Sequence, residues 1–166
     1  MTSQEQATGY QTGTDKLLVE VAGPVATVTF NNPAKRNAIS AEMRTALPGL
    51  LATLDADDDV RVVVVTGAGD KAFASGADIS EFGAQRTAVA DRAAYDRRQA
   101  ALTEAWAGMN KPVIAMIRGF CMGGGLLTAL GADIRIASDD SQFGVPAARL
   151  GLGYGFSGVT ALTDLI

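Results

Sequence analysis

The pattern of apolar and polar positions changes its period several times along the chain, and each change predicts a new element. Two apolar runs, residues 17–21 and 25–30, flank the turn Ala22-Gly23-Pro24, which is typical of a β-hairpin. Ser40 is a typical helix N-cap, and the apolar residues after it follow helical spacing to about Leu54. The first third of the chain is therefore predicted to contain a hairpin followed by a helix.

Two later runs, residues 60–66 and 111–117, are rich in β-branched and apolar residues and predict strands. The first, VRVVVVT, has the composition of a strand buried on both faces. A capping-box pattern at residues 78–81 predicts a helix start. Further helical patterns cover residues 86–108, 123–130 and 159–166, and strand-like patterns cover residues 132–137 and 141–145. This alternation of strand, turn and helix predicts a layered α/β fold.

Two glycine-containing turns follow strand-like stretches and are the most informative chemistry in the chain. One lies in Lys71-Ala72-Phe73-Ala74-Ser75-Gly76-Ala77-Asp78-Ile79, and the other is Gly123-Gly124-Gly125 after the strand-like residues 111–119. Turns that open helices leave backbone N–H groups without intrahelical partners, and the helix dipole adds positive potential there. If the two turns converge, their N–H groups form an oxyanion hole, which needs no reactive side chain.

Composition narrows the class of protein. The chain has 166 residues, of which 48% are hydrophobic and 19% charged, as expected for one globular domain with a polar tail over residues 1–15. Its formal net charge is −4 and no run of Lys and Arg exceeds two residues, so a nucleic-acid partner is not expected. No apolar run approaches ~18 residues, so the sequence predicts no membrane span, and the polar N-terminus favours the cytoplasm.

The absence of histidine removes whole mechanisms. The chain has no histidine and one cysteine, Cys121, so Ser-His-Asp and Cys-His systems are excluded and no metal site is predicted. A single cysteine cannot form an intrachain disulfide and fits a reducing compartment. Proton transfer must therefore use Asp, Glu, Lys, Tyr, Cys or water.

Six motifs in order give the chain a resemblance to the crotonase superfamily, the enoyl-CoA hydratase/isomerase family. These are Asn32-Pro33-Ala34-Lys35-Arg36-Asn37-Ala38, Ala72-Phe73-Ala74-Ser75-Gly76-Ala77-Asp78, Lys111-Pro112-Val113-Ile114-Ala115, Gly123-Gly124-Gly125, Ala132-Asp133-Ile134-Arg135-Ile136-Ala137 and Phe143-Gly144. The resemblance covers residues 16–166. It implies a spiral of repeated ββα units, an acyl-CoA substrate in fatty acid metabolism, no prosthetic group, and a homotrimer or hexamer.

The resemblance also implies site residues. The two oxyanion N–H groups fall on Ala77 and Gly124. The family's coenzyme A contacts map to Ala34, Lys35, Arg36, Ala38, Ala72, Ser75, Asp78 and Ile79. Lys35 and Arg36 are suited to pair with phosphates through charge-assisted hydrogen bonds.

The chain departs from the family pattern at three places. Family hydratases carry glutamates where this chain has Leu127 and Ala147, and neither residue can hold or deprotonate water. Family members also continue past residue 166 into a C-terminal helical region, which this chain lacks. We therefore expect little hydratase activity and consider three readings: an enolate-forming isomerase or lyase, a non-catalytic acyl-CoA-binding protein, and an inactive fragment.

Other residues are weaker candidates. The helical stretch after the first turn carries possible substitute acids or bases, each of which is also consistent with a solvated helix face: Glu81, Asp91, Tyr95, Asp96 and Glu104. Asp78 is expected to act as an N-cap, Asp133 to be structural, Arg149 to contact either solvent or substrate, and Tyr154 and Phe156 to narrow the acyl site. Gly153-x-Gly155-x-x-Gly158 matches a dinucleotide fingerprint formally, but no apolar strand precedes it.

Overall fold

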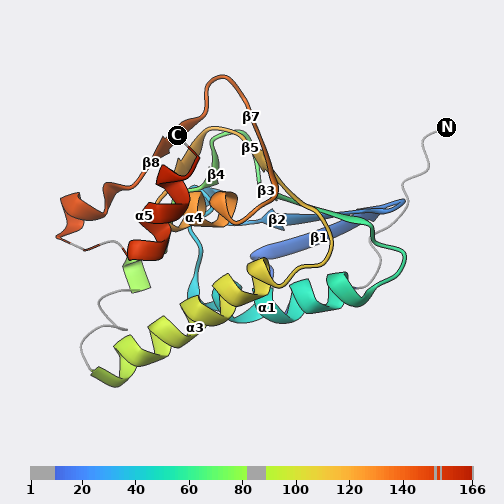
Figure 1. Cartoon of the computed structure of the whole chain (residues 1–166), viewed down its shortest axis with the longest axis horizontal. Helices are drawn as coiled ribbons and strands as arrows, with labels where there is room; N and C mark the ends of the chain where they lie inside the picture. Colours follow the sequence, from blue (N-terminus) through green and yellow to red (C-terminus); the bar gives the residue numbers. More distant parts are fainter. Residues whose placement is uncertain (1–9, 82–88, 152, 154, 166) are drawn as a thin grey trace.

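Two β-sheets and the helices around them form the part of the chain that the computed structural model describes, residues 10–81, 89–151, 153 and 155–165 (Figure 1). The larger sheet has the strand order β1-β2-β3-β5-β7, and the smaller has the order β4-β6-β8. The strands are β1 (Leu17–Ala22), β2 (Val25–Phe30), β3 (Val62–Gly67), β4 (Ala72–Ala74), β5 (Val113–Ile117), β6 (Phe120–Met122), β7 (Ile134–Ala137) and β8 (Gln142–Gly144).

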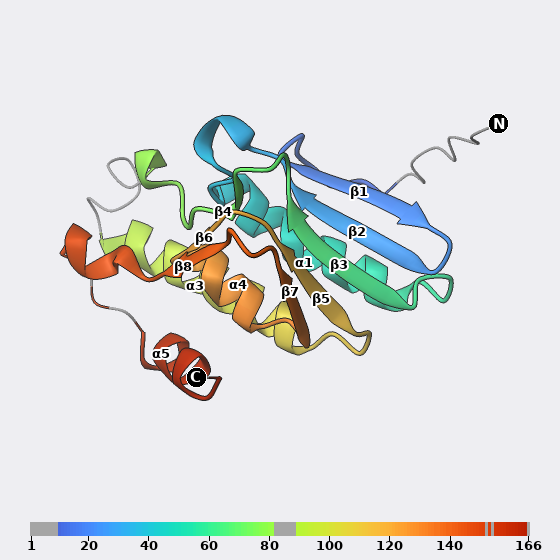
Figure 2. The same ribbon diagram turned by 90° about the horizontal axis from the view of Figure 1, so that it is seen from above.

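Helices connect the strand pairs. The α-helices are α1 (Ala41–Ala56), α3 (Val89–Ala107), α4 (Gly124–Leu130) and α5 (Phe156–Thr163), and the 3-10 turns are η1 (Pro33–Lys35), η2 (Ile79–Glu81) and η3 (Pro146–Leu150). In Figure 1, α1 and α3 run side by side beneath the larger sheet. Seen from above, the larger sheet lies in front of α1 (Figure 2). The smaller sheet lies beside the larger one, near α4.

The chain passes repeatedly from the larger sheet to the smaller one. β3, β5 and β7 lie in the larger sheet, and each is followed directly by a strand of the smaller sheet, namely β4, β6 and β8. Among the strand pairs of the described residues, β1–β2 is antiparallel and the others are parallel. This is the predicted spiral of ββα units, and it confirms the expected α/β class.

The core lies between the larger sheet and α1 and α3. Alternate residues of β2 and β3 are fully buried there, among them Val28, Val63 and Val65. On the other face Met116, Ile134 and Ile136 are 48%, 51% and 58% exposed. In β3 itself Val62, Val64 and Thr66 are only partly buried, so the prediction that the run at residues 60–66 is buried on both faces was wrong. Among the described residues, α1 and α3 cover one face of the sheet.

Most predicted elements are present, with shifted ends. The hairpin and the helix after Ser40 are confirmed, and the Ser40 hydroxyl accepts the Met43 N–H at 3.3 Å. At residues 78–81, where the capping-box pattern predicts the start of a helix, the structure has the 3-10 turn η2. Residues 82–88 lie outside the described part. α5 begins at Phe156, earlier than predicted, and β4 and β6 were not predicted.

Residues 10–15 of the predicted tail contact the folded core. The Tyr10 ring packs against the core, and its hydroxyl donates a hydrogen bond to the Asp57 carboxylate. Within the described ranges, the helices are too short or too polar to cross a membrane. In the same ranges, His, Cys, Asp and Glu side chains form no group of three that is able to hold a metal ion.

Candidate active site

The two predicted glycine turns meet at one point. β4 and β6 are parallel neighbours, so their carboxyl ends lead into adjacent turns. A Cβ atom on Gly76 would lie 3.4 Å from the Gly124 nitrogen and 3.2 Å from the Met122 carbonyl oxygen. Gly76 also has φ 103°, a conformation that side chains disfavour. Only glycine therefore lets the first turn approach the second this closely.

The second turn is equally crowded. A Cβ on Gly125 would lie 2.4 Å from the Ala74 carbonyl oxygen, which shows that α4 begins directly against β4. Gly123 precedes the helix with φ 51°. A Cβ on Gly124, in contrast, would lie 3.6 Å from the Ala77 nitrogen, which is an ordinary contact. The sequence therefore brings the amide nitrogens of Ala77 and Gly124 into one neighbourhood.

These two amides are also available to a ligand. Among the described residues, neither the Ala77 N–H nor the Gly124 N–H donates a hydrogen bond, whereas the neighbouring Asp78 and Gly123 N–H groups do. Ala77 and Gly124 are both partly exposed. Unpaired backbone donors that converge on a solvent-accessible point are able to bind an oxygen that carries negative charge.

The two segments predicted to contact coenzyme A lie side by side. The Ser75 N–H donates to the Arg36 carbonyl at 3.0 Å, and the Ser75 hydroxyl donates to the Lys35 carbonyl at 3.0 Å. Among the predicted contacts, Ala34, Lys35 and Arg36 are exposed, Ile79 is 60% exposed, Ser75 is partly exposed, and Ala38, Ala72 and Asp78 are buried. The structure thus brings these residues together without testing their role.

Lys35 has a partner within the chain. Its ammonium lies 2.7 Å from an Asp78 carboxylate oxygen and 2.9 Å from the Ser80 hydroxyl. Burial raises the pKa of the Asp78 carboxyl, but the hydrogen bonds from Lys35 and Ser80 outweigh it and hold the pKa below its usual value. The Asp78 carboxylate also accepts the Ser80 N–H at 3.1 Å, so Asp78 caps the η2 turn as predicted.

Arg36 is held beside β6. Its guanidinium lies 4.9 Å from the centre of the Phe120 ring, and its φ of 51° is left-handed. A guanidinium over an aromatic face is attracted by the ring's quadrupole. The Arg36 side chain is therefore placed at the start of β6, the strand that leads into the second turn.

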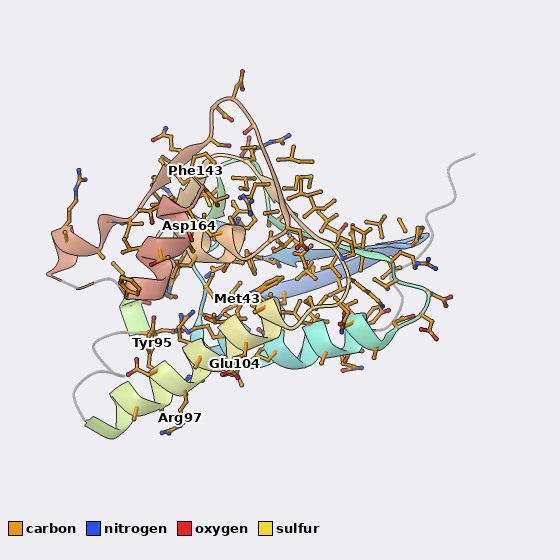
Figure 3. All side chains as sticks on the ribbon, viewed as in Figure 1. Met43, Tyr95, Arg97, Glu104, Phe143 and Asp164 are labelled. Carbon is orange, nitrogen blue, oxygen red and sulfur yellow. The ribbon has the colours of Figure 1, made fainter. Side chains whose placement is uncertain are left out.

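The predicted substitute acids and bases are not all near these turns. Asp96 and Glu104 are exposed on α3, and the Asp91 side chain lies outside the described part of the chain. Tyr95 lies on the inward side of α3, whereas Arg97 points outward (Figure 3). Of the predicted candidates, Glu81 and Tyr95 both contact Arg44, which donates a hydrogen bond to the Ile39 carbonyl next to the Ala77 turn.

Sequence reasoning missed Arg44. This residue is 2% exposed, donates to the Ile39 carbonyl at 2.7 Å and pairs with Glu81 at 3.3 Å. Burial lowers the pKa of its guanidinium, while Tyr95 and Glu81 oppose that effect. Arg44, Leu47 and Leu51 follow i, i+3, i+7 spacing on the buried face of α1, and an arginine at such a position signals a buried acid partner.

Asn37 was recognised only as part of a motif. It is 1% exposed, and its amide donates to the Ala68 and Ala72 carbonyls at 2.9 and 2.7 Å. Its side-chain oxygen accepts the Asn32 N–H at 3.0 Å. Asn37 therefore ties the residue 31–38 loop to the strand that leads into the first turn.

The remaining candidates have structural surroundings. Asp133 accepts the Val113 N–H at 2.7 Å, which agrees with its predicted structural role. Cys121 is fully buried, and burial raises the pKa of its thiol to about 12. Arg149 is exposed, and so is Phe156, at 87%. Leu127 on α4 and Ala147 on η3, which occupy the expected glutamate positions, are partly exposed.

Comparison with known proteins identifies the family. The family model for enoyl-CoA hydratase/isomerase matches residues 20–166. The chain is 34% identical to the short-chain-enoyl-CoA hydratase of Clostridium acetobutylicum, over 92% of this chain and 58% of that protein. It is 37% identical to the (E)-benzylidenesuccinyl-CoA hydratase of Thauera aromatica, over 89% of this chain and 57% of that protein.

A solved structure agrees. The enoyl-CoA hydratase/carnithine racemase from Magnetospirillum magneticum superposes with a TM-score of 0.86 at 35% identity, over 92% of this chain and 57% of that one. The chain therefore belongs to the enoyl-CoA hydratase/isomerase family. It spans 57–58% of the length of these relatives.

Proposed function

We propose that residues 16–166 form the acyl-CoA-binding core of an enzyme that stabilises a thioester enolate. The Ala77 and Gly124 N–H groups hold the thioester carbonyl oxygen. When a base removes the proton from the adjacent carbon, the electron pair moves to that oxygen and the two hydrogen bonds strengthen. The observation that carries this proposal is the pair of neighbouring, unpaired and partly exposed amides at the ends of β4 and β6.

Coenzyme A binding is proposed for the adjoining surface. The residues that we propose contact coenzyme A are Ala34, Lys35, Arg36, Ala38, Ala72, Ser75, Asp78 and Ile79. The first three are exposed beside the first turn. The Lys35 side chain is half exposed while its ammonium contacts Asp78 and Ser80, so a phosphate is able to approach that ammonium from solvent.

Isomerase or lyase chemistry fits this chain better than hydration. Hydration needs groups that orient and deprotonate water, and the residues at the two expected positions are Leu127 and Ala147. The two relatives named above are hydratases, so we propose that this chain catalyses a different reaction from theirs. Family membership and the amide pair support carbonyl polarisation, which hydration, isomerisation and decarboxylation share.

Replacement of Gly124 tests the oxyanion role. Gly124→Pro removes the N–H, whereas Gly124→Ala keeps it and adds a methyl group in ordinary contact with the Ala77 nitrogen and with Gly76. We expect the wild-type chain and Gly124→Ala to bind butyryl-CoA more tightly than free coenzyme A in calorimetric titrations. Gly124→Pro should lose this preference and retain its affinity for coenzyme A, and any turnover should fall about 10²–10³-fold. Equal affinity of the wild-type chain for both ligands would refute the assignment.

A second candidate function is non-catalytic acyl-CoA binding, which is favoured by the absence of both glutamates. Exchange of the α-protons of bound butyryl-CoA in D2O separates the two functions. An enolate-forming enzyme exchanges these protons, and the exchange is followed by mass spectrometry. A binding protein prefers butyryl-CoA over coenzyme A but leaves the α-protons in place.

A further inference from the structure

An ion pair between buried Arg44 and partly exposed Glu81 lies next to the segment that carries the proposed oxyanion donor. Arg44 on α1 is 2% exposed, and one of its terminal nitrogens lies 3.3 Å from a Glu81 carboxylate oxygen. Its guanidinium also lies 5.0 Å from the centre of the Tyr95 ring on α3. The pair thus joins α1, α3 and the end of the turn that begins at Ala77.

Arg44 donates to the same carbonyl that accepts the N–H of the peptide following Ala77. The Ile39 carbonyl oxygen accepts a hydrogen bond from Arg44 at 2.7 Å and another from the Asp78 N–H at 3.1 Å. The Ile39 N–H donates to the Gly76 carbonyl at 2.7 Å, and Ile39 and Ala77 form a parallel bridge. The backbone on both sides of Ala77 is therefore attached to Ile39, which leaves the Ala77 N–H unpaired between them.

Glu81 links the η2 turn to the start of α1. Its two carboxylate oxygens accept the Ala41 N–H at 2.9 and 3.2 Å, so Glu81 caps the first turn of α1. Residues 78–81 are consequently fixed at both ends: Asp78 through Ile39, and Glu81 through Ala41 and Arg44. Arg44 and Glu81 therefore contact the residues whose backbone is bonded on both sides of Ala77.

We propose that the Arg44–Glu81 ion pair positions the Ala77 N–H for the thioester oxygen, and this inference rests on the proposed function. Arg44 and Glu81 are positioning residues, since they act through Ile39 and the η2 turn. An oxyanion donor must be held within about 0.5 Å of its working position by supporting contacts.

Stability alone does not account for the pair. Arg44 is buried, and the free-energy cost of removing its charge from water often offsets what its ion pair contributes. Moreover, the Arg44 Nε is buried and has no hydrogen-bond partner in the described part of the chain, so the guanidinium is incompletely satisfied. The pair instead restrains the orientation of the Ala77 backbone. Its hydrogen bonds end on residues 39–41, which are bonded to the residues on both sides of Ala77.

Three variants and one control test this role. Arg44→Met keeps the volume and removes the charge and both donors. Arg44→Lys keeps the charge but cannot reach two acceptors in the same way. Glu81→Gln keeps an acceptor for Ala41 and removes the charge. Leu51→Ala is the matched control, because it removes buried volume from the same helix at a residue that lies outside the Ile39–Ala77 network.

Two readouts separate positioning from stability. The first is hydrogen exchange of the Asp78 amide in the free protein, measured by NMR. The second is the 13C shift of the thioester carbonyl of bound butyryl-CoA, which reports the polarisation of that carbonyl. We expect Arg44→Met to accelerate Asp78 exchange at least about tenfold and to reduce the carbonyl shift, while affinity for free coenzyme A stays within about threefold of wild type.

The other variants complete the test. Glu81→Gln should change both readouts in the same direction, Arg44→Lys should restore part of the effect, and Leu51→Ala should lower the unfolding midpoint without changing the carbonyl shift. Wild-type Asp78 exchange and carbonyl shift in Arg44→Met, or in Glu81→Gln if Arg44→Met does not fold, would overturn the inference. If the wild-type chain polarises no thioester, the proposed function fails, whereas the exchange measurement still decides whether the pair fixes the turn.

Discussion

The Asp78 side chain links Lys35, on the predicted coenzyme A surface, to the η2 turn. It is 5% exposed and accepts hydrogen bonds from Lys35, from the Ser80 hydroxyl and from the Ser80 N–H. All three donors favour the ionised carboxylate, so the pKa of Asp78 is held below its usual value despite burial. The ionised form is therefore part of the folded state.

This pKa shift predicts a pH-dependent loss of stability. A carboxyl whose pKa is lowered by folding stabilises the protein above the pKa it has when unfolded, and this contribution is lost as the pH falls through the folded pKa. Asp78→Asn should lower the free energy of unfolding by about 1–3 kcal/mol at pH 7. The difference from wild type should narrow below about pH 4.

Urea unfolding at a series of pH values measures this difference. Asp58→Asn is the control, because Asp58 is exposed and has no hydrogen bond or ion pair with the described residues. A difference between Asp78→Asn and wild type that is the same at pH 7 and pH 3 would show that the carboxylate charge does not contribute.

At the residue scale, the sequence revealed the glycines better than the charged side chains. Gly76 and Gly124 were recognised because glycine turns have local signatures, and the structure brings them together. The partners of Lys35 and Arg44 lie 43 and 37 residues away along the chain. Such pairings depend on how the strands of two sheets bring loops together, which one sequence does not specify.

Among the elements, α1 is the one whose start is best explained by its sequence. Ser40 caps it from within the local sequence, and Glu81 caps it from a distant turn. The capping-box pattern at residues 78–81 was only half right: Asp78 caps η2, but the Glu81 carboxylate accepts the Ala41 N–H of α1 instead of the Asp78 N–H. A local pattern identifies a side chain suited to capping, but tertiary contacts decide which helix it caps.

The short strands β4 and β6 were missed for a related reason. Each has three residues, too few to show the alternation that identifies a strand, and each follows a longer run closely. The longer strands, the hairpin and the repeated order of elements were predictable because they carry periodic apolar patterns. The two strands that lead into the candidate site were therefore missed, although the glycine turns after them were recognised.

A prediction for α1 concerns Gly49. This glycine is exposed within the helix, and a Cβ on it would meet no atom within 4 Å. Gly49→Ala should raise the free energy of unfolding by about 0.5–1 kcal/mol, because alanine restricts the unfolded chain and favours the helix. Urea unfolding followed by circular dichroism measures the change.

The contrasting substitution is Gly125→Ala in α4. There a Cβ would lie 2.4 Å from the Ala74 carbonyl oxygen, so the same change should destabilise the protein. A gain in stability from Gly125→Ala, or a loss from Gly49→Ala, would contradict the packing described for these two helices.

At the scale of the whole molecule, the two sheets share one core. Phe30 on β2 of the larger sheet and Phe73 on β4 of the smaller sheet meet edge to face, with ring centres 5.7 Å apart and an interplanar angle of 73°. Both are at most 1% exposed, and both belong to the core cluster that also contains Trp106 of α3. We therefore expect the sheets and α3 to unfold together.

Phe73→Ala tests this coupling. The substitution should lower the free energy of unfolding by about 3–5 kcal/mol, the usual range for a buried phenylalanine. Trp106 is the only tryptophan in the chain, so its fluorescence reports on α3, while circular dichroism reports on all elements. Because the core is continuous, both transitions should move to lower urea by the same amount.

Phe73→Leu keeps the measurement possible if Phe73→Ala is largely unfolded, since it leaves a smaller cavity and should give a smaller shift of both transitions. If Trp106 fluorescence keeps its wild-type midpoint while the circular dichroism midpoint falls, the smaller sheet unfolds separately from α3. In that case the strand that leads into the Ala77 turn would open without the rest of the molecule, and the amide pair would be less rigid than a shared core implies. A common shift, in contrast, means that the stability of the whole core holds the two amides in place.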